Sequence, residues 1–254
     1  MFPYRDENET VRTPIVTLAL IAANALVWFM VQGAGAGEAL AASVCNLGLI
    51  PAELTLLAPP GAGFAMGNGL ACLVDPGRAP EHILYSMFLH GGWGHLLGNM
   101  WFLWLFGNNV EDSMGRLRFV LFYLLCGSAA ALAQVLAQPS SIVPMVGASG
   151  AIGGVMGAYV VMFPRARVFT LVWLLFFVTS FALPAWVMLG YWFVLQLFGS
   201  LGGAESGVAF WAHVGGFAAG VLLIKLFVRP DYLQQHKARH WRPHHLGMDR
   251  SRWR

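Results

Sequence analysis

The chain has 254 residues, of which 57% are hydrophobic and only 11% are charged, and its formal net charge is +3. Soluble domains carry about 25% charged residues, so 15 Lys and Arg with 12 Asp and Glu are too few to cover a water-facing surface of this size. This composition argues against a soluble enzyme, a disordered chain and a nucleic-acid binder. The apolar excess and the 30 glycines are typical of helices that pack in lipid, and we predict an all-α membrane protein.

Six uncharged apolar stretches are predicted to span the bilayer, which takes about 20 residues of helix. In chain order they are Pro14–Val31, Gly92–Asn109, Leu117–Leu136, Ser149–Phe163, Pro184–Leu201 and Phe210–Val228. The first run is long for a signal peptide, so we predict a retained span, with a cleaved signal as the alternative. A seventh apolar stretch, Val168–Leu183, directly precedes the fifth span.

The basic residues decide how many of these stretches cross the bilayer. With six spans and a cytoplasmic N-terminus, every Lys and Arg except Arg78 lies on the inner side, as the positive-inside rule requires. If Val168–Leu183 also crossed, the basic tail would lie outside. We therefore predict that this stretch is a re-entrant or interfacial segment on the inner side. The predicted organisation is a cytoplasmic segment at 1–13, a six-helix membrane domain at 14–228 and a basic cytoplasmic tail at 229–254.

A long first outer loop follows the first span, at Gln32–Glu81. Within it, Leu47–Leu57 is predicted to be an amphipathic segment on the membrane surface. Cys45 and Cys72 share this loop, and two alternatives stay open for them. They form a disulfide in an oxidising periplasm, or they are two unpaired, small apolar residues.

Polar side chains at membrane depth mark function by default, because they are costly in lipid. The informative ones are His90, His95, Asn99, Ser149 and His213. Spans two, four and six all enter from the outer side, so their first turns lie at one depth. His95 and Asn99 lie in the first turns of span two, Ser149 begins span four, and His213 lies near the start of span six. The topology therefore predicts that these four side chains converge.

Ser149 lies in Gly147-Ala148-Ser149-Gly150 and begins a span of only about 15 residues. At helical rise this is about 22 Å, against roughly 30 Å of hydrocarbon, so Ser149 is predicted below the outer surface. A polar helix start at that depth needs a protein-lined or water-filled cavity. The alternative is an ordinary helix N-cap.

Glycines follow both Ser149 and His213 at spacings of four. They are Gly153 and Gly157 after the serine, and Gly216 and Gly220 after the histidine. Small faces of this kind let two helix backbones approach closely, as a short Ser–His hydrogen bond requires. The alternatives are glycine faces for packing alone and a histidine that is satisfied by a neighbour on its own helix.

His95 and Asn99 are four residues apart and therefore share one helix face. Their N–H groups are donors of the kind that form an oxyanion hole, and the alternative is structural hydrogen bonding between helices. His90 is predicted to precede the helix and to brace the outer loop. His90 and His95 lie on different helix faces without an adjacent acid, so we predict neither a metal nor another cofactor.

Taken in chain order, these motifs resemble the rhomboid intramembrane serine proteases. The motifs are His90-x4-His95-x3-Asn99, then Gly147-Ala148-Ser149-Gly150, then His213 with Gly216 and Gly220. The flanks Phe88-Leu89-His90-Gly91-Gly92-Trp93 and Gly107-Asn108-Asn109-Val110-Glu111-Asp112 are similar to bacterial members. The resemblance covers about residues 10–228.

The resemblance implies a six-helix core, in a bacterial inner membrane, with a Ser–His dyad. It implies that Ser149 is the nucleophile and His213 the general base, and that the Ser149 backbone N–H forms an oxyanion hole with His95 and Asn99. His90 and the glycines 147, 150, 153, 157, 216 and 220 are the supporting residues. The implied substrate is a transmembrane helix of another membrane protein, cut near its outer end.

One position departs from the family pattern. Some members carry a tyrosine four residues after the serine, where it stacks on the histidine, and this chain has Gly153. The orientation of His213 must then come from other packing, for which Trp211 and Tyr159 are candidates. Gly199–Ser206 is predicted to be a flexible loop that covers the site and moves to admit substrate and water.

Three alternatives to a protease are less consistent with the sequence. A catalytically silent rhomboid-like binder of membrane proteins would be indicated by loss of Ser149 or His213, and both are present. A transporter or channel would spread ionisable residues through the membrane depth, whereas here they cluster at one end. The basic tail, His236–Arg254, is expected to contact anionic lipid headgroups rather than nucleic acid.

Overall fold

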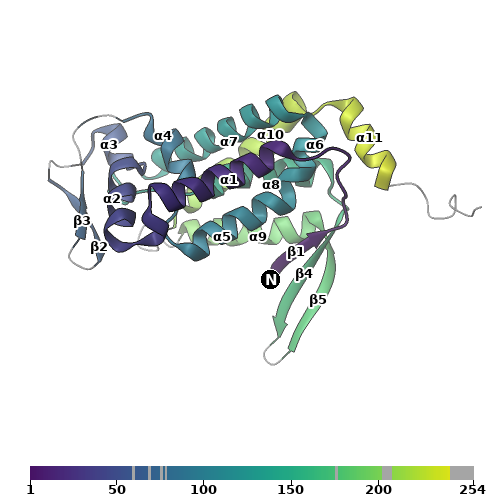
Figure 1. Cartoon of the computed structure of the whole chain (residues 1–254), viewed down its shortest axis with the longest axis horizontal. Helices are drawn as coiled ribbons and strands as arrows, with labels where there is room; N and C mark the ends of the chain where they lie inside the picture. The colour runs from purple at the N-terminus through teal and green to yellow at the C-terminus, as the bar shows by residue number, and fades with distance from the viewer. Residues whose placement is uncertain are drawn as a thin grey trace, which may run out of the picture.

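The computed structural model describes residues 1–58, 61–67, 70–74, 77, 79–174, 177–201 and 208–240. A bundle of helices forms the body of the molecule, and small β-structures extend from it (Figure 1). The bundle helices are α1 (Ile15–Met30), α5 (Trp93–Phe102), α6 (Asn108–Met114), α7 (Arg116–Ala137), α8 (Ser149–Met162), α9 (Ala185–Leu201) and α10 (Phe210–Phe227). A π-helical turn, Leu103–Gly107, joins α5 to α6.

Each of the six predicted spans is helical in the structure. Five agree with the prediction to within one or two residues at each end, and the helix of the second span continues past Asn109 through α6 to Met114. By length and composition, α7 and α10 are apolar enough to cross a bilayer, while α1, α8 and α9 are shorter apolar helices.

Two smaller groups of elements lie toward opposite ends of the bundle (Figure 1). One contains α2 (Gly37–Leu47), α3 (Pro51–Thr55), α4 (His82–Tyr85) and the hairpin β2 (Gly63–Gly67) and β3 (Leu70–Leu73), with 3₁₀ turns at Gly33–Gly35 and Ser86–Phe88. The other contains α11 (Pro230–His240) and the strands β1 (Phe2–Asp6), β4 (Arg167–Leu174) and β5 (Phe177–Pro184).

α8 is the central helix of the bundle. Its residues from Gly150 to Tyr159 are all buried, and the sequence is apolar on every side, as expected of a helix without a solvent face. It packs against α7, α9 and α10. Ser149, its first residue, therefore lies at one end of the central helix.

The contact between α8 and α10 is made by glycines. A Cβ atom on Gly216 would overlap the carbonyl group of Gly150, and one on Gly220 would overlap the carbonyl group of Gly154. Gly157 likewise has no room for a side chain beside the backbone of α10. The predicted close approach of these two helices is therefore confirmed.

Val168–Leu183 is a β-hairpin. β4 and β5 pair antiparallel with Val168 opposite Leu183, and β1 pairs with the other edge of β4. The sheet projects sideways from the bundle (Figure 1). The segment does not cross as a helix, in agreement with the charge argument, but its strand structure was not predicted. An apolar run without alternation does not distinguish strand from helix by periodicity.

The structure of the loop after the first span differs from the prediction in one segment. It also decides between the two alternatives for Cys45 and Cys72. Leu49 and Ile50 are each only 1% exposed, because Leu49 packs against Ala131 and Val135 of α7 and Ile50 packs against Ala52 and Val74. The prediction that Leu47–Leu57 lies on the membrane surface is therefore wrong for its central part. Cys45 and Cys72 form a disulfide that joins α2 to β3.

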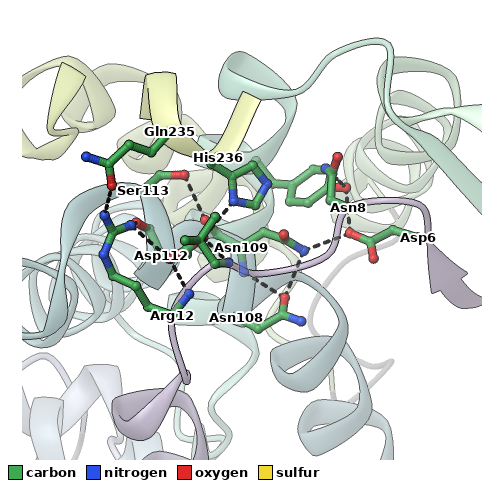
Figure 2. Close-up of polar contacts among 11 residues, drawn as sticks. Asp6, Asn8, Arg12, Asn108, Asn109, Asp112, Ser113, Gln235 and His236 are labelled. Carbon is green, nitrogen blue, oxygen red and sulfur yellow. Dashed lines mark hydrogen bonds and ion pairs between the residues drawn. The ribbon is translucent and has the colours of Figure 1, made fainter. Parts of the chain in front are cut away.

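A polar cluster joins the N-terminal segment and α11 to α6 (Figure 2). Asp112 of α6 accepts hydrogen bonds from the backbone N–H groups of Val11 and Arg12, at 2.8 and 3.0 Å, and from the Arg12 guanidinium. It also lies 2.7 Å from Nδ1 of His236, a buried residue of α11. The N-terminal segment and α11 are therefore held on one carboxylate.

A second carboxylate in the cluster belongs to the N-terminal strand (Figure 2). Asp6 accepts hydrogen bonds from the Tyr159 hydroxyl at 2.7 Å and from the Asn109 amide at 2.8 Å. Burial raises the pKa of Asp6 from 3.8 to about 7, although the hydrogen bond from Tyr159 lowers it. Tyr159, a candidate for orienting His213, instead binds β1.

Candidate active site

Ser149 and His213 form the hydrogen bond that their glycine neighbours predicted. Ser149 Oγ lies 2.7 Å from His213 Nε2, with the serine at the start of α8 and the histidine in the first turn of α10. Ser149 does not act as the cap of its helix, because the N-cap residue is Ala148. The hydroxyl group is therefore turned to the histidine rather than to the helix backbone.

The other ring nitrogen of His213 contacts a residue that the sequence analysis missed. Nδ1 lies 2.7 Å from Oε1 of Gln196, on α9. The aromatic neighbours of His213 are Trp192, with 5.9 Å between ring centroids, and Phe210, with 6.3 Å. A signal for Gln196 was present, since it is the only amide side chain in an otherwise apolar fifth span.

Gly147 allows His95 to approach the turn before Ser149. Its φ of +128° favours glycine, and a Cβ atom there would lie 2.7 Å from Nε2 of His95. Nδ1 of His95 accepts the backbone N–H of Gly91 at 3.2 Å, so the proton of a neutral ring is on Nε2. His95 therefore presents a donor beside Gly147.

Asn99 carries a second donor in the same place. Its side chain is buried, and its Nδ2 has no hydrogen-bond partner in the part of the chain that the structure describes. Asn99, His95, Ser149 and His213 all line one cavity of about 380 Å³. A buried donor without a partner is unfavourable, so the cavity offers a site for an oxygen atom that accepts a hydrogen bond.

The supporting residues lie around this cavity. His90 is fully buried and does not line it. Its backbone N–H and C=O bind the side-chain amide of Gln32, each at 2.8 Å, and its ring lies 5.1 Å from that of His95. A Cβ on Gly153 would lie 3.1 Å from the carbonyl oxygen of His213. Gly150 packs against Ala130 of α7.

Several of the sequence predictions concern residues that lie outside the described part of the chain. Arg78, most of the loop Gly199–Ser206 and the tail 241–254 lie outside the described residues. The described start of the tail is helical, as α11. Within the ranges that the structure covers, no three His, Cys, Asp or Glu side chains are grouped as metal ligands would be.

Comparison with known proteins finds one family repeatedly. A family model described as "Rhomboid domain" matches residues 79–230. The chain is 34% identical over 183 residues to "RHOMBOID-like protein 4" of Arabidopsis thaliana, which covers 71% of this chain and 43% of that protein. It is 31% identical over 147 residues to "Rhomboid protein 1, mitochondrial" of Saccharomyces cerevisiae, covering 55% and 40%.

A bacterial relative matches over a shorter region. "Rhomboid protease GluP" of Bacillus subtilis is 41% identical over 76 residues, which is 30% of this chain and 14% of that protein. The matches thus span less than half the length of each of these three relatives. Residues 79–230 contain His90, His95, Asn99, Ser149, Gln196 and His213.

Proposed function

Because the chain belongs to the rhomboid family, and is therefore a helical integral membrane protein, we propose that it is an intramembrane serine endopeptidase. The observation that carries the proposal is the 2.7 Å hydrogen bond between Ser149 and His213, beside a cavity lined by His95 and Asn99. The bacterial relative named "Rhomboid protease GluP" supports the same class of activity.

The proposed reaction is acyl transfer through Ser149. Nε2 of His213 takes the hydroxyl proton as Oγ attacks the scissile carbonyl carbon, and a tetrahedral intermediate forms. The negative oxygen of this intermediate accepts hydrogen bonds from His95 Nε2–H, Asn99 Nδ2–H and the backbone N–H of Ser149. Donors that are already in place need no reorganisation during the reaction.

Collapse of the intermediate breaks the peptide bond. The imidazolium of His213 gives its proton to the leaving amine, which departs with one part of the substrate, and Ser149 holds the other part as an acyl ester. A water molecule then gives a proton to His213 and attacks the ester. The second product leaves as a carboxylic acid, and Ser149 regains its proton.

The proposed substrate is a transmembrane segment of another membrane protein. A peptide carbonyl within a helix is shielded by its hydrogen bond and by the surrounding turn, so the segment must unwind before Ser149 can attack. Helix-weakening residues such as Gly and Pro near the cut favour this unwinding. No cofactor takes part in the proposed reaction.

The proposed topology has six spans, with both ends in the cytoplasm of a bacterium and the protein in its inner membrane. Positions of charge and sulfur support it. The Cys45–Cys72 disulfide lies in the loop assigned to the oxidising outer side, whereas Arg116, Arg118 and Arg229 lie where α7 begins and α10 ends. We retain 14–228 as the proposed membrane domain.

Proteolysis by variants of the two central residues tests the function. The protein is reconstituted in liposomes with a single-span substrate containing a Gly-rich outer turn, and cleavage is followed for wild type, Ser149→Ala and His213→Ala. We expect wild type to cleave and to react with a fluorophosphonate. We expect no labelling of Ser149→Ala and a loss of about 10²–10⁴-fold in rate for His213→Ala.

Three other results would have distinct meanings. Undiminished cleavage by Ser149→Ala would overturn the nucleophile. Labelling of wild type without cleavage would uphold the reactive serine and reject the chosen substrate class. If wild type is not labelled and does not cleave the substrate, the result would favour the catalytically silent binder.

A further inference from the structure

Gln196 links α9 to the proposed catalytic pair. The residue lies one helical turn after Trp192, and both side chains lie beside the ring of His213. We propose that Gln196 is a positioning residue, which holds His213 in the tautomer that can accept a proton from Ser149. This inference rests on the proposed function and adds to it a third side chain, from a helix that carries neither member of the pair.

The orientation of the Gln196 amide follows from its own hydrogen bonds. Its Nε2 donates to the backbone carbonyl of Trp192 at 3.4 Å. The amide nitrogen therefore faces its own helix, and Oε1 faces His213 at 2.7 Å. An amide with the opposite orientation would set its NH₂ group against the histidine and its oxygen against a carbonyl oxygen, which is unfavourable.

This orientation fixes the proton on the imidazole. An amide oxygen can only accept, so the 2.7 Å contact requires a proton on Nδ1 of His213. In a neutral ring, Nε2 then carries a lone pair and accepts the hydrogen bond from Ser149 Oγ–H. The opposite tautomer would place an N–H against the hydroxyl and a lone pair against Oε1.

The same contact stabilises the charged ring that forms during the reaction. When His213 has taken the serine proton, both ring nitrogens donate, and the Nδ1–H still meets the negative end of the Gln196 amide dipole. A carboxylate in this position acts more strongly because it is charged. Gln196 therefore offers orientation with weaker electrostatic stabilisation.

Gly153 of α8, one turn after the serine, has no side chain that could perform this task, and a Cβ atom there would lie only 3.1 Å from the His213 carbonyl oxygen. α9 takes over this role with Gln196 and with the indole of Trp192, whose ring centroid lies 5.9 Å from that of His213. The site is thus complete only when α9 lies against α10.

The surroundings of His213 contain few other charges. Among the described residues, His95 of α5 is the other titratable side chain that lines the cavity. α8 and α9 face it with Ser149, Gln196 and Trp192. A charge placed at position 196 is therefore the dominant new influence on the titration of His213.

Two substitutions at position 196 test the proposal, and Leu195→Met is the matched control on the exposed face of α9. Gln196→Met keeps the length of the side chain and removes the acceptor. We expect it to lower the rate of fluorophosphonate labelling about 10- to 100-fold. Gln196→Glu restores an acceptor with a charge, which favours the imidazolium form. We expect the Gln196→Glu enzyme to be active. Its loss of activity on the acid side should occur about one pH unit above that of wild type.

The ¹⁵N NMR spectrum of labelled histidine provides a readout that does not depend on any substrate. In Ser149→Ala, which the proposal leaves unreactive, we expect His213 to carry its proton on Nδ1, and in the double variant with Gln196→Met we expect a mixture of both tautomers. A side chain that only fills space would change neither the tautomer nor the pH profile.

The results separate this inference from the proposed function. If Ser149→Ala is inactive while Gln196→Met labels at the wild-type rate with an unchanged pH profile, the positioning role is overturned and the protease stands. If Ser149→Ala cleaves normally, the proposed protease function is rejected, independently of the results at position 196. If Gln196→Met does not fold, the pH profile of Gln196→Glu decides, and a profile equal to that of wild type overturns the positioning role.

Discussion

Gly220 of α10 and the carbonyl group of Gly154 on α8 are in direct contact, and no side chain can be placed between them. The same arrangement recurs one turn earlier, between Gly216 and the carbonyl group of Gly150. Backbone contact of this kind brings two helix axes together more closely than side chains allow. It sets the separation of the helices that carry Ser149 and His213.

Gly220→Ala is expected to destabilise the protein and to reduce activity with it. Overpacking in a well-packed core costs about 1–3 kcal/mol, and the helices must move apart to admit the methyl group. The measurement is the temperature at which the buried thiol of Cys126 becomes reactive toward a fluorescent maleimide in detergent. Gly190→Ala is the control, since a Cβ atom there meets nothing within 4 Å. Equal unfolding temperatures for the two variants would contradict the packing argument.

Asn99→Ala tests the unpaired donor in the cavity. Loss of one donor from an oxyanion hole typically costs about 10²–10³ in kcat, and we expect a decrease of this order in cleavage of a model substrate. Because Nδ2 of Asn99 has no partner among the described residues, its removal should leave the unfolding temperature the same or higher. A stability loss with unchanged turnover would instead identify Asn99 as a structural residue.

Much of this architecture could be predicted because its signals are local. Apolar length and the placement of Arg and Lys predict the helices, and the proposed topology predicts that Ser149 and His213 lie close together. The β4–β5 hairpin was missed because Val168–Leu183 is uncharged and mostly apolar, so it shows no clear strand alternation. The contact of Gln196 with His213 depends on how α9 rotates against α10, and a single amide in a span does not encode that rotation. Asp6 and Tyr159 lie 153 residues apart, and nothing in the local pattern of either residue indicates the other.

Asp6 is expected to make stability fall as the pH rises. Its pKa is about 7 in the folded protein and about 3.9 in an unfolded chain, so between these values the folded state binds more protons. The free energy of unfolding therefore decreases from about pH 4 to about pH 7. In Asp6→Asn this contribution is absent. The difference in unfolding temperature between wild type and Asp6→Asn, measured from pH 5 to 8, should shift steadily in favour of the variant, whereas parallel curves would show that Asp6 does not titrate in this range.

Asp112 is expected to have the opposite effect on the pH dependence of stability, so that stability falls as the pH decreases. Although burial raises its pKa, hydrogen bonds from His236, the Val11 backbone and Arg12 bring it below its ordinary value. A lowered pKa stabilises the folded state above the unfolded pKa of about 3.9, and this contribution is lost as the pH falls through the folded value. Asp112→Asn should therefore be less stable than wild type at pH 7 and should approach it under strongly acidic conditions. Limited proteolysis near α11 would show whether the C-terminal helix is released.

The sheet β1–β4–β5 is expected to lie against the membrane surface. Phe177, Val178 and Phe181 are 75%, 53% and 47% exposed, which is unusual for a sheet in water, and the hairpin is continuous with the apolar helix α9. Arg165 and Arg167 precede and begin β4, where they can meet anionic headgroups. These features favour a sheet whose exposed apolar side chains contact lipid.

A single fluorophore at the hairpin tip tests this arrangement. Cys45 and Cys72 are paired and Cys126 is buried, so Val178→Cys in a Cys126→Ala background gives one reactive thiol. In anionic liposomes we expect an environment-sensitive probe at position 178 to be quenched by nitroxide-labelled lipid and shielded from iodide, because the sheet places it among headgroups or acyl chains. The same probe at the exposed position Ala238 of α11 should be open to iodide. Equal iodide quenching at the two positions would mean that the hairpin extends into water and would overturn the contact with lipid.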